Sequence, residues 1–179
     1  MQFNDLYNLI TENDAHRSYS CLMLDCSNLN EQLLDFQKTI DADDIWEDRP
    51  GFGLEKGFHI TILYGIHSNI PGYVYSQVGL FPIKYTLGKV SLFENDEYDV
   101  LKIDIRSSDL HKLNASCKEE LDHTSTYPTY IPHLTIGYLK KGTGKKYTKR
   151  PHGITGVQES NRFIFSDQFS QKVVWTIQE

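Results

Sequence analysis

Two short segments of the sequence repeat the same order of chemically active side chains. Residues 59–64 read HITILY and residues 133–138 read HLTIGY, so both fit the pattern H-[IL]-T-I-x-Y. The composition of the chain gives even one such match rarely by chance, and two matches indicate a repeated functional motif. Alternate side chains of a strand share a face, so each His lies about 7 Å from its Thr while the aliphatic residues face the other way.

The four polar side chains of the motifs, His59, Thr61, His133 and Thr135, have the chemistry to break a phosphodiester without a metal ion. A neutral imidazole can take a proton from the nucleophile, and a protonated imidazole can give one to the leaving oxygen, because the pKa of His lies near neutrality. The Thr hydroxyls can hold the non-bridging oxygens and the charge that builds on them. A single His-x-Thr segment is more simply a core histidine beside a threonine. The duplication favours a catalytic pair, whose acid and base the sequence leaves unassigned.

The sequence around the motifs predicts an α+β fold with mostly antiparallel strands. Apolar alternation and strand-forming residues predict strands at residues 19–26, 58–65, 84–93, 98–106 and 133–139, and a closing hairpin at 162–166 and 172–177. The elements are interleaved too irregularly for a doubly wound parallel sheet. Each motif is therefore expected on a strand that buries its aliphatic side chains.

Helical spacing of apolar residues predicts helices over residues 29–40 and 108–123. The candidate N-caps are Ser27 or Asn28 for the first helix and Ser107 or Ser108 for the second. Residues 41–57 mix acidic residues with Gly and Pro and are expected to form a long loop. Loops of that length inside a compact domain are usually functional or mobile.

The composition is that of one folded domain, residues 1–179, with 39% hydrophobic residues and a net charge of −6. An acidic chain is a poor binder of long nucleic acid, because that affinity comes from neutralising many phosphates. Residues 140–150, KKGTGKKYTKR, nevertheless contain six basic residues and no acidic one. This segment either draws a small polyanionic nucleotide toward the second motif or is a solvated, mobile loop.

Several other classes of protein do not fit the sequence. Cys21, Cys26 and Cys117 have no CxxC spacing, which argues against a disulfide framework and a cysteine zinc site. His59 with His67, or His111 with His123, lack the spacing of metal ligands, so we expect no metal and no cofactor. No apolar run reaches the roughly 20 residues of a membrane span, and the first residues do not resemble a signal peptide, so a cytoplasmic protein is expected.

The paired motifs resemble those of the two-histidine (2H) phosphoesterase superfamily. Within it, the runs YSCLMLD, HITILYGIH, LGKVSLFENDEYDVLKID and PHLTIGYLKKG are most similar to phage anti-CBASS nucleases, which degrade cyclic di- and trinucleotide signals of bacterial defence such as cGAMP. The resemblance covers residues 18–140 and the last strands. It implies a bilobal, pseudo-symmetric 2H phosphoesterase fold with helices on the outside and both motifs in a central cleft. It also implies metal-independent cleavage of 3′-5′ bonds, begun by the neighbouring ribose 2′-hydroxyl, in the cytoplasm of a bacterial host.

By the same resemblance, His59 and His133 are the catalytic pair, and Thr61 and Thr135 hold the phosphate. A cyclic-nucleotide pocket is also expected to stack aromatic side chains on the bases. The candidate substrate-binding residues are Tyr19, Phe93, Trp175 and the cation Lys140. Each aromatic residue could instead belong to the core or the surface, and Phe93 stands where the family has a tryptophan.

Two alternative functions stay open. One is an RNA-end or 2′,3′-cyclic nucleotide phosphodiesterase of the same superfamily, which acts on linear ends rather than closed rings. The other is a non-catalytic sponge that binds a cyclic nucleotide without cutting it. Two intact histidines argue against the sponge, which needs no proton-transfer groups. The expected partner in each case is a small nucleotide, with no long nucleic acid and no membrane.

Overall fold

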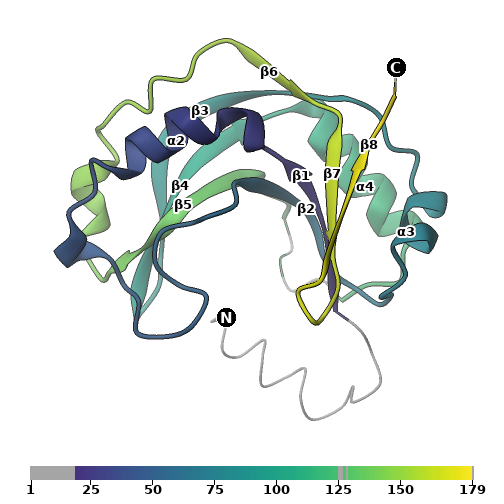
Figure 1. The fold of residues 1–179 in the computed structure, drawn as a ribbon, viewed down its shortest axis with the longest axis horizontal. Coiled ribbons are helices and arrows are strands. Elements are labelled where there is room, and N and C mark those ends of the chain that lie inside the picture. Colours follow the sequence, from purple (N-terminus) through teal and green to yellow (C-terminus); the bar gives the residue numbers. More distant parts are fainter. Residues whose placement is uncertain (1–18, 125–126, 128, 179) are drawn as a thin grey trace.

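The computed structural model describes residues 19–124, 127 and 129–178. Within these residues eight strands form one sheet in the order β6-β3-β4-β5-β2-β1-β7-β8, and neighbouring strands are antiparallel. The sheet is strongly curved, with β2 and β5 near its centre (Figure 1). The strands are β1 (Ser20–Asp25), β2 (His59–Ile66), β3 (Ile83–Glu94), β4 (Tyr98–Arg106), β5 (His133–Lys140), β6 (Val157–Ser160), β7 (Arg162–Ser166) and β8 (Lys172–Thr176).

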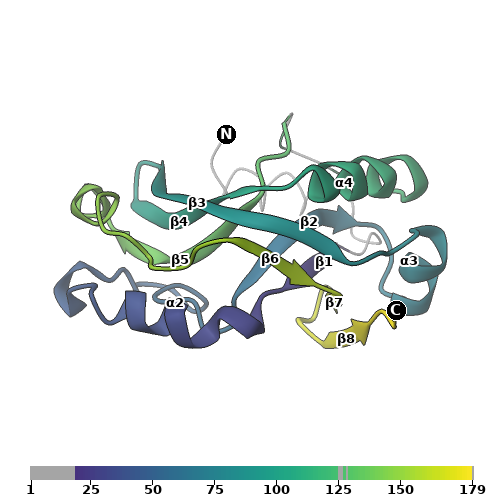
Figure 2. The same ribbon diagram turned by 90° about the horizontal axis from the view of Figure 1, so that it is seen from above.

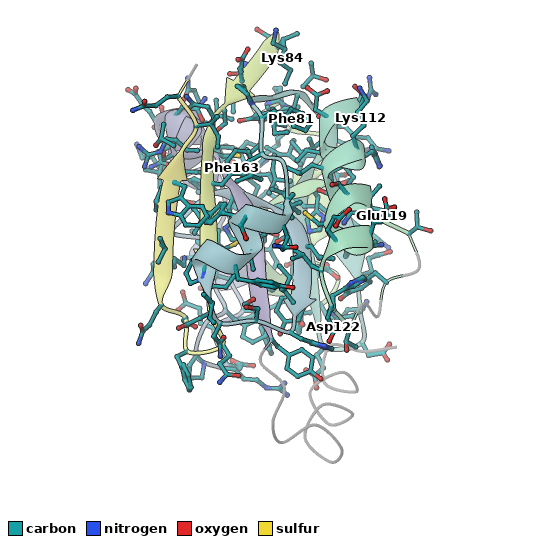
Figure 3. All side chains as sticks on the ribbon, turned by 90° about the vertical axis from the view of Figure 1, so that its right-hand side faces the viewer. Phe81, Lys84, Lys112, Glu119, Asp122 and Phe163 are labelled. Carbon is teal, nitrogen blue, oxygen red and sulfur yellow. The ribbon has the colours of Figure 1, made fainter. Side chains whose placement is uncertain are left out.

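The α-helices lie on the convex side of the curved sheet (Figure 1, Figure 2). They are α2 (Asn30–Gln37), α3 (Pro71–Gln77) and α4 (Ser108–Glu120). Their apolar side chains and the aliphatic residues of the strands form one buried cluster, and burial of each large apolar side chain contributes about 1.5–3 kcal/mol. Lys112 and Glu119 lie on the solvent side of α4, whereas Phe163 of β7 is fully buried (Figure 3). The concave side of the sheet is therefore the side without helices.

The helix starts differ from each other in how they are capped. Ser107 is the N-cap of α4, since its Oγ accepts a hydrogen bond from the Leu110 amide at 3.1 Å, which confirms one of the two predicted positions. The N-cap of α2 is Leu29, so the prediction of Ser27 or Asn28 is wrong. The physical reason is that the Asp25 carboxylate accepts from the Ser27 amide, and the chain makes a 3-10 turn before α2 begins.

The two motif strands touch closely only where the motifs lie. Ile60 of β2 pairs with Leu134 of β5, and beyond this point other segments take up the strand edges. The long loop lies along β5, where the Glu55 amide donates to the Ile136 carbonyl at 3.0 Å. The Thr124 amide donates to the Gly65 carbonyl of β2 at 2.9 Å. The loop of residues 41–57 is thus tied to the sheet and helps to fix the second motif.

Other elements are close to their predicted ranges, with two additions. The hairpin of β3 and β4 is confirmed, and its Asn95 side chain accepts from the Glu97 and Tyr98 amides. The weakly patterned region before β3 contains α3, which begins at Pro71, a residue favoured at the first helical position. Strand β6 has no sequence signal of its own and forms because it pairs with β3. In the described part of the chain, no helix has the length and apolar character needed to cross a membrane.

Candidate active site

The two motifs form a compact group of four side chains at the centre of the sheet. The antiparallel pair Ile60 and Leu134 places His59 across from Thr135 and Thr61 across from His133. Ile60 and Leu134 are fully buried on the convex side, so the four polar side chains face the concave side, where all are partly exposed. Side chains directly across from each other have Cβ atoms about 4.5–5.5 Å apart. One small anion can therefore contact both motifs.

The two imidazoles are oriented in the same way. The Nδ1 atom of His59 lies 2.8 Å from the Gly57 carbonyl oxygen, and Nδ1 of His133 lies 2.8 Å from the Ile131 carbonyl oxygen. A carbonyl oxygen only accepts hydrogen bonds, so in both rings Nδ1 carries the proton. In the neutral ring Nε2 is then free to accept a proton, and in the charged ring it can give one. Both histidines thus present Nε2 for chemistry.

A β-bulge fixes each motif at the same position. Opposite β1, Ile62 of β2 is an extra residue without a partner, and opposite β4, Ile136 of β5 is an extra residue as well. The carbonyl of Ile62 accepts a hydrogen bond from the Asn114 side chain of α4 at 2.7 Å. The carbonyl of Ile136 accepts one from the Gln37 side chain of α2 at 2.8 Å. Both amide side chains are buried, so each bulge is held by a helix on the convex side.

An aspartate paired with a cation flanks each histidine. Asp25 of β1 is the strand partner of His59, and its Oδ2 accepts from Nε of Arg162 at 2.9 Å. Asp104 of β4 is the strand partner of His133, and its Oδ1 lies 2.5 Å from Nζ of Lys102. Both cations are therefore on the side of the sheet that carries the motifs.

Lys102 is enclosed by its surroundings. Only 5% of its side chain is exposed, and Nζ donates to Ser91 Oγ at 2.7 Å as well as to Asp104. The ammonium also lies 4.3 Å from the centre of the Phe93 ring, a cation–π contact. The Phe93 ring in turn meets the His133 ring edge-on, with the ring centres 4.9 Å apart. Lys102 and Phe93 thus form one wall beside His133.

This wall affects the protonation of the second histidine. Burial lowers the pKa of His133, and the charges of Lys102 and His59 lower it further. The Ile131 carbonyl and the Asp104 carboxylate act in the opposite direction but do not reverse the shift. His133 is therefore neutral at pH 7, and its Nε2 can accept a proton.

The structure brings one of the four predicted substrate-binding residues to the motifs and leaves three apart. Phe93 lies against His133. Tyr19 lies at the opposite end of β2, where its ring meets that of His67 edge-on. Trp175 pairs with the buried Phe163 and packs on Tyr75 of α3, on the convex side. Lys140 is the last residue of β5, about 20 Å along the strand from His133.

Three of the six basic residues in the segment of residues 140–150, Lys141, Lys145 and Lys146, are paired with acidic residues. Lys145 Nζ lies 3.0 Å from Glu94, and Lys146 Nζ lies 2.7 Å from Asp41 and 2.6 Å from Asp44. These contacts offset about half of the positive charge that the sequence concentrates here.

Sequence reasoning missed the charged neighbours of the histidines. A signal for Lys102 and Asp104 exists, because two opposite charges two residues apart in an apolar strand share one face. Asp25 and Arg162 carry no such signal, since only the pairing of β1 with β7 brings them together. Among the described residues, no three His, Cys, Asp or Glu side chains gather as metal ligands.

Comparisons with known proteins give a clear result at the level of structure. No family model matches the sequence, and no curated protein does either. Among solved structures, Escherichia coli LigT complexed with 3′-AMP matches with a TM-score of 0.57 and 12% identity, over 90% of this chain and 95% of that one. Kluyveromyces marxianus Usb1 with uridine monophosphate matches with a TM-score of 0.56 and 9% identity, over 89% and 98%.

A third solved structure, of a phosphoesterase, matches with a TM-score of 0.57 and 12% identity, over 91% of this chain and 97% of that one. At such low identities the likeness concerns the fold. These matches cover most of the chain, and the sheet is curved and antiparallel with its helices outside. The fold is therefore the predicted α+β fold of the 2H phosphoesterases.

Proposed function

We propose that the protein is a metal-independent phosphodiesterase that cleaves 3′-5′ bonds of cyclic di- or trinucleotides, as a phage counter-defence nuclease. The observation that carries this proposal is the central group of two His-x-Thr motifs on neighbouring strands. In this group each Nδ1 is tied to a backbone carbonyl at 2.8 Å, which leaves each Nε2 for proton transfer. Two such imidazoles supply both the acid and the base of the reaction.

The surroundings of the histidines favour one division of roles. His133, held neutral, takes the proton of the ribose 2′-hydroxyl, whose oxygen then attacks the neighbouring phosphorus. As the bond between phosphorus and the 5′-oxygen breaks, a protonated His59 gives its Nε2 proton to that oxygen. The products are a free 5′-hydroxyl and a 2′,3′-cyclic phosphate, which water then opens with the two histidines again as acid and base. Thr61 and Thr135 donate hydrogen bonds to the non-bridging oxygens.

The cyclic substrate rests on the resemblance of the motif-bearing runs to anti-CBASS nucleases. Two of the solved structures with similar folds hold mononucleotides, 3′-AMP and uridine monophosphate, which supports a small nucleotide as ligand. They equally favour a second candidate, an RNA-end or 2′,3′-cyclic nucleotide phosphodiesterase. A substrate panel separates the two, because only the proposed function includes opening of a closed ring.

The test is incubation of the protein with a 3′,3′-linked cyclic dinucleotide in the presence of EDTA, followed by chromatography of the products. We expect linear products with wild type and none with the double variant His59→Ala, His133→Ala. The matched control is His111→Ala, an exposed histidine on α4, which should keep full activity. Intact nucleotide bound to folded wild type would indicate a sponge. Cleavage of 2′,3′-cyclic phosphates alone would favour the second candidate.

A further inference from the structure

Arg162 lies in a row with the first catalytic histidine on the concave side of the sheet. Leu24 of β1 pairs with Phe163 of β7, so the next pair along is Asp25 with Arg162. Asp25 is also the strand partner of His59. Neighbouring strands are about 4.8 Å apart, so the backbone of Arg162 lies about 10 Å from that of His59. Asp25 lies between the two residues, so a ligand that extends across β1 can contact both the His59 and the Arg162 side chains.

The guanidinium of Arg162 is fixed along one edge and open along the other. Its Nε donates to Asp25 Oδ2 at 2.9 Å, and the Asp25 carboxylate is itself held by the amide and hydroxyl of Ser27. Asp25 is buried, whereas 52% of the Arg162 side chain is exposed. Within the described residues the two terminal nitrogens of Arg162 make no other hydrogen bond or ion pair. They form a pre-oriented fork of donors, which suits a phosphate.

Lys102, the cation on the other side of the motifs, is not available to bind a phosphate. Lys102 is almost completely enclosed, and its ammonium is shared among Asp104, Ser91 and the face of Phe93. Its donors are used within the protein, so a substrate reaches it only by displacing these partners. Of these two cations, Arg162 is thus the one that is both held in place and accessible.

We propose that Arg162 binds a second phosphate of the substrate, one nucleotide away from the bond that is cleaved. This inference rests on the proposed phosphodiesterase function and narrows its substrate class. A guanidinium gives two parallel hydrogen bonds to a phosphate, which adds both affinity and orientation. The site is then built for nucleotides with at least two phosphates. A nucleoside 2′,3′-cyclic monophosphate occupies the catalytic group and leaves Arg162 unused.

The test compares Arg162→Gln with wild type on two substrates, a 3′,3′-cyclic dinucleotide and a nucleoside 2′,3′-cyclic monophosphate. We expect kcat/KM for the dinucleotide to fall about 10- to 100-fold, mainly through KM, because charge-assisted hydrogen bonds are lost. For the monophosphate we expect a change of less than about twofold. Arg162→Lys should recover part of the loss, since it keeps the charge but not the fork.

The matched control is Arg49→Gln, which removes another half-exposed arginine in an ion pair, with Glu97 at 3.2 Å, and should not alter the ratio of the two activities. Melting curves of all variants check the fold. An equal loss on both substrates, or no loss on either, would overturn the role of Arg162.

Calorimetric titration with a phosphorothioate cyclic dinucleotide and with a nucleoside monophosphate separates this inference from the proposed function. If wild type cleaves neither substrate, the phosphodiesterase proposal fails. The Arg162 site then stands only if Arg162→Gln weakens binding of the dinucleotide about 10- to 100-fold and leaves the monophosphate unchanged. Equal binding by variant and wild type, or no binding by wild type, overturns it.

Discussion

The half of the molecule around β2 and the half around β5 position their histidines with equivalent hydrogen bonds. In both, the Nδ1 atom is tied to the carbonyl two residues earlier, and the bulged Ile three residues after the His is held by a buried amide side chain. The helix that supplies the buried amide belongs in each case to the other half of the chain. Asn114 of α4, which precedes the second motif, holds the first motif, and Gln37 of α2, which precedes the first motif, holds the second. Each half therefore needs the other for its geometry.

The charged neighbours of the two histidines differ. Beside His59 the ion pair of Asp25 is with an exposed arginine, and beside His133 the ion pair of Asp104 is with an enclosed lysine. Phe93 closes the second side further. The shared hydrogen bonds set where the two imidazoles lie, and the unequal surroundings lower the pKa of His133 and set what each ring can contact. A duplicated motif can thus divide the roles of acid and base without a change in the motif itself.

The largest expected effect comes from removing either histidine. His59→Ala and His133→Ala should each lower kcat on the nucleotide substrate about 10²- to 10⁴-fold. A nucleoside 3′-(p-nitrophenyl phosphate) with a free 2′-hydroxyl separates their roles, because its leaving group needs no proton. We expect this substrate to restore most of the activity of His59→Ala and little of His133→Ala, measured by release of nitrophenolate. The reverse pattern would show that His133 is the acid and His59 is the base.

A second effect concerns the buried amide that each half supplies to the other. Asn114→Leu removes the side-chain donor to the Ile62 carbonyl. Gln37→Leu removes the side-chain donor shared by the Ile136 and Glu55 carbonyls, and Ile136 keeps its bond from the Glu55 amide. Each change should lower the free energy of unfolding by about 1–3 kcal/mol. Urea titration measures the change. Gln77→Leu, at the exposed end of α3, is the control and should change stability by less than about 0.5 kcal/mol. If the two halves are equivalent, the two variants lose similar amounts of unfolding free energy. A loss in only one variant would show that the two bulges are not held equally.

A third effect tests the unequal surroundings directly. The pKa of His133 is lowered by burial, by Lys102 and by His59, and raised by the Ile131 carbonyl and Asp104. A base acts only when deprotonated, so a lowered pKa extends activity toward acidic pH. Lys102→Met should therefore move the acidic limb of the kcat/KM profile to higher pH, so that the rate at pH 6 falls more than the rate at pH 8.

Asp104→Asn is the matched variant for this test, because loss of the carboxylate should move the acidic limb in the opposite direction. NMR titration of the His133 ring protons gives the same comparison without catalysis. An acidic limb and a ring titration unchanged in both variants would show that these charges do not act on His133.

The sequence predicts the parts of this arrangement that depend on local patterns. Alternation of polar and aliphatic residues identifies the two motif strands and their polar face, and Ser107 identifies the start of α4. Pairing of distant strands carries no local pattern, so the meeting of Asp25 with Arg162 and the position of Trp175 on the convex side were not predictable. The bulges at Ile62 and Ile136 likewise arise from register, which the sequence does not state.

The smallest expected effect is at the basic segment of residues 140–150, which the charge pattern alone made the strongest electrostatic candidate. Lys145 is paired with Glu94, and the segment follows the end of β5 that is far from His133. Exposed pairs contribute little and are screened by salt. We expect Lys145→Gln with Lys149→Gln to change kcat/KM on a cyclic dinucleotide by less than about twofold at 0.15 M salt, well below the effect of Arg162→Gln. Rate measurements between 0.02 and 0.15 M salt check this, because a tenfold loss at low salt would show that the segment steers the nucleotide. The comparison separates abundant charge that lies far from the motifs from a single charge beside them, Arg162, whose Nε is held by Asp25 and whose terminal nitrogens are open.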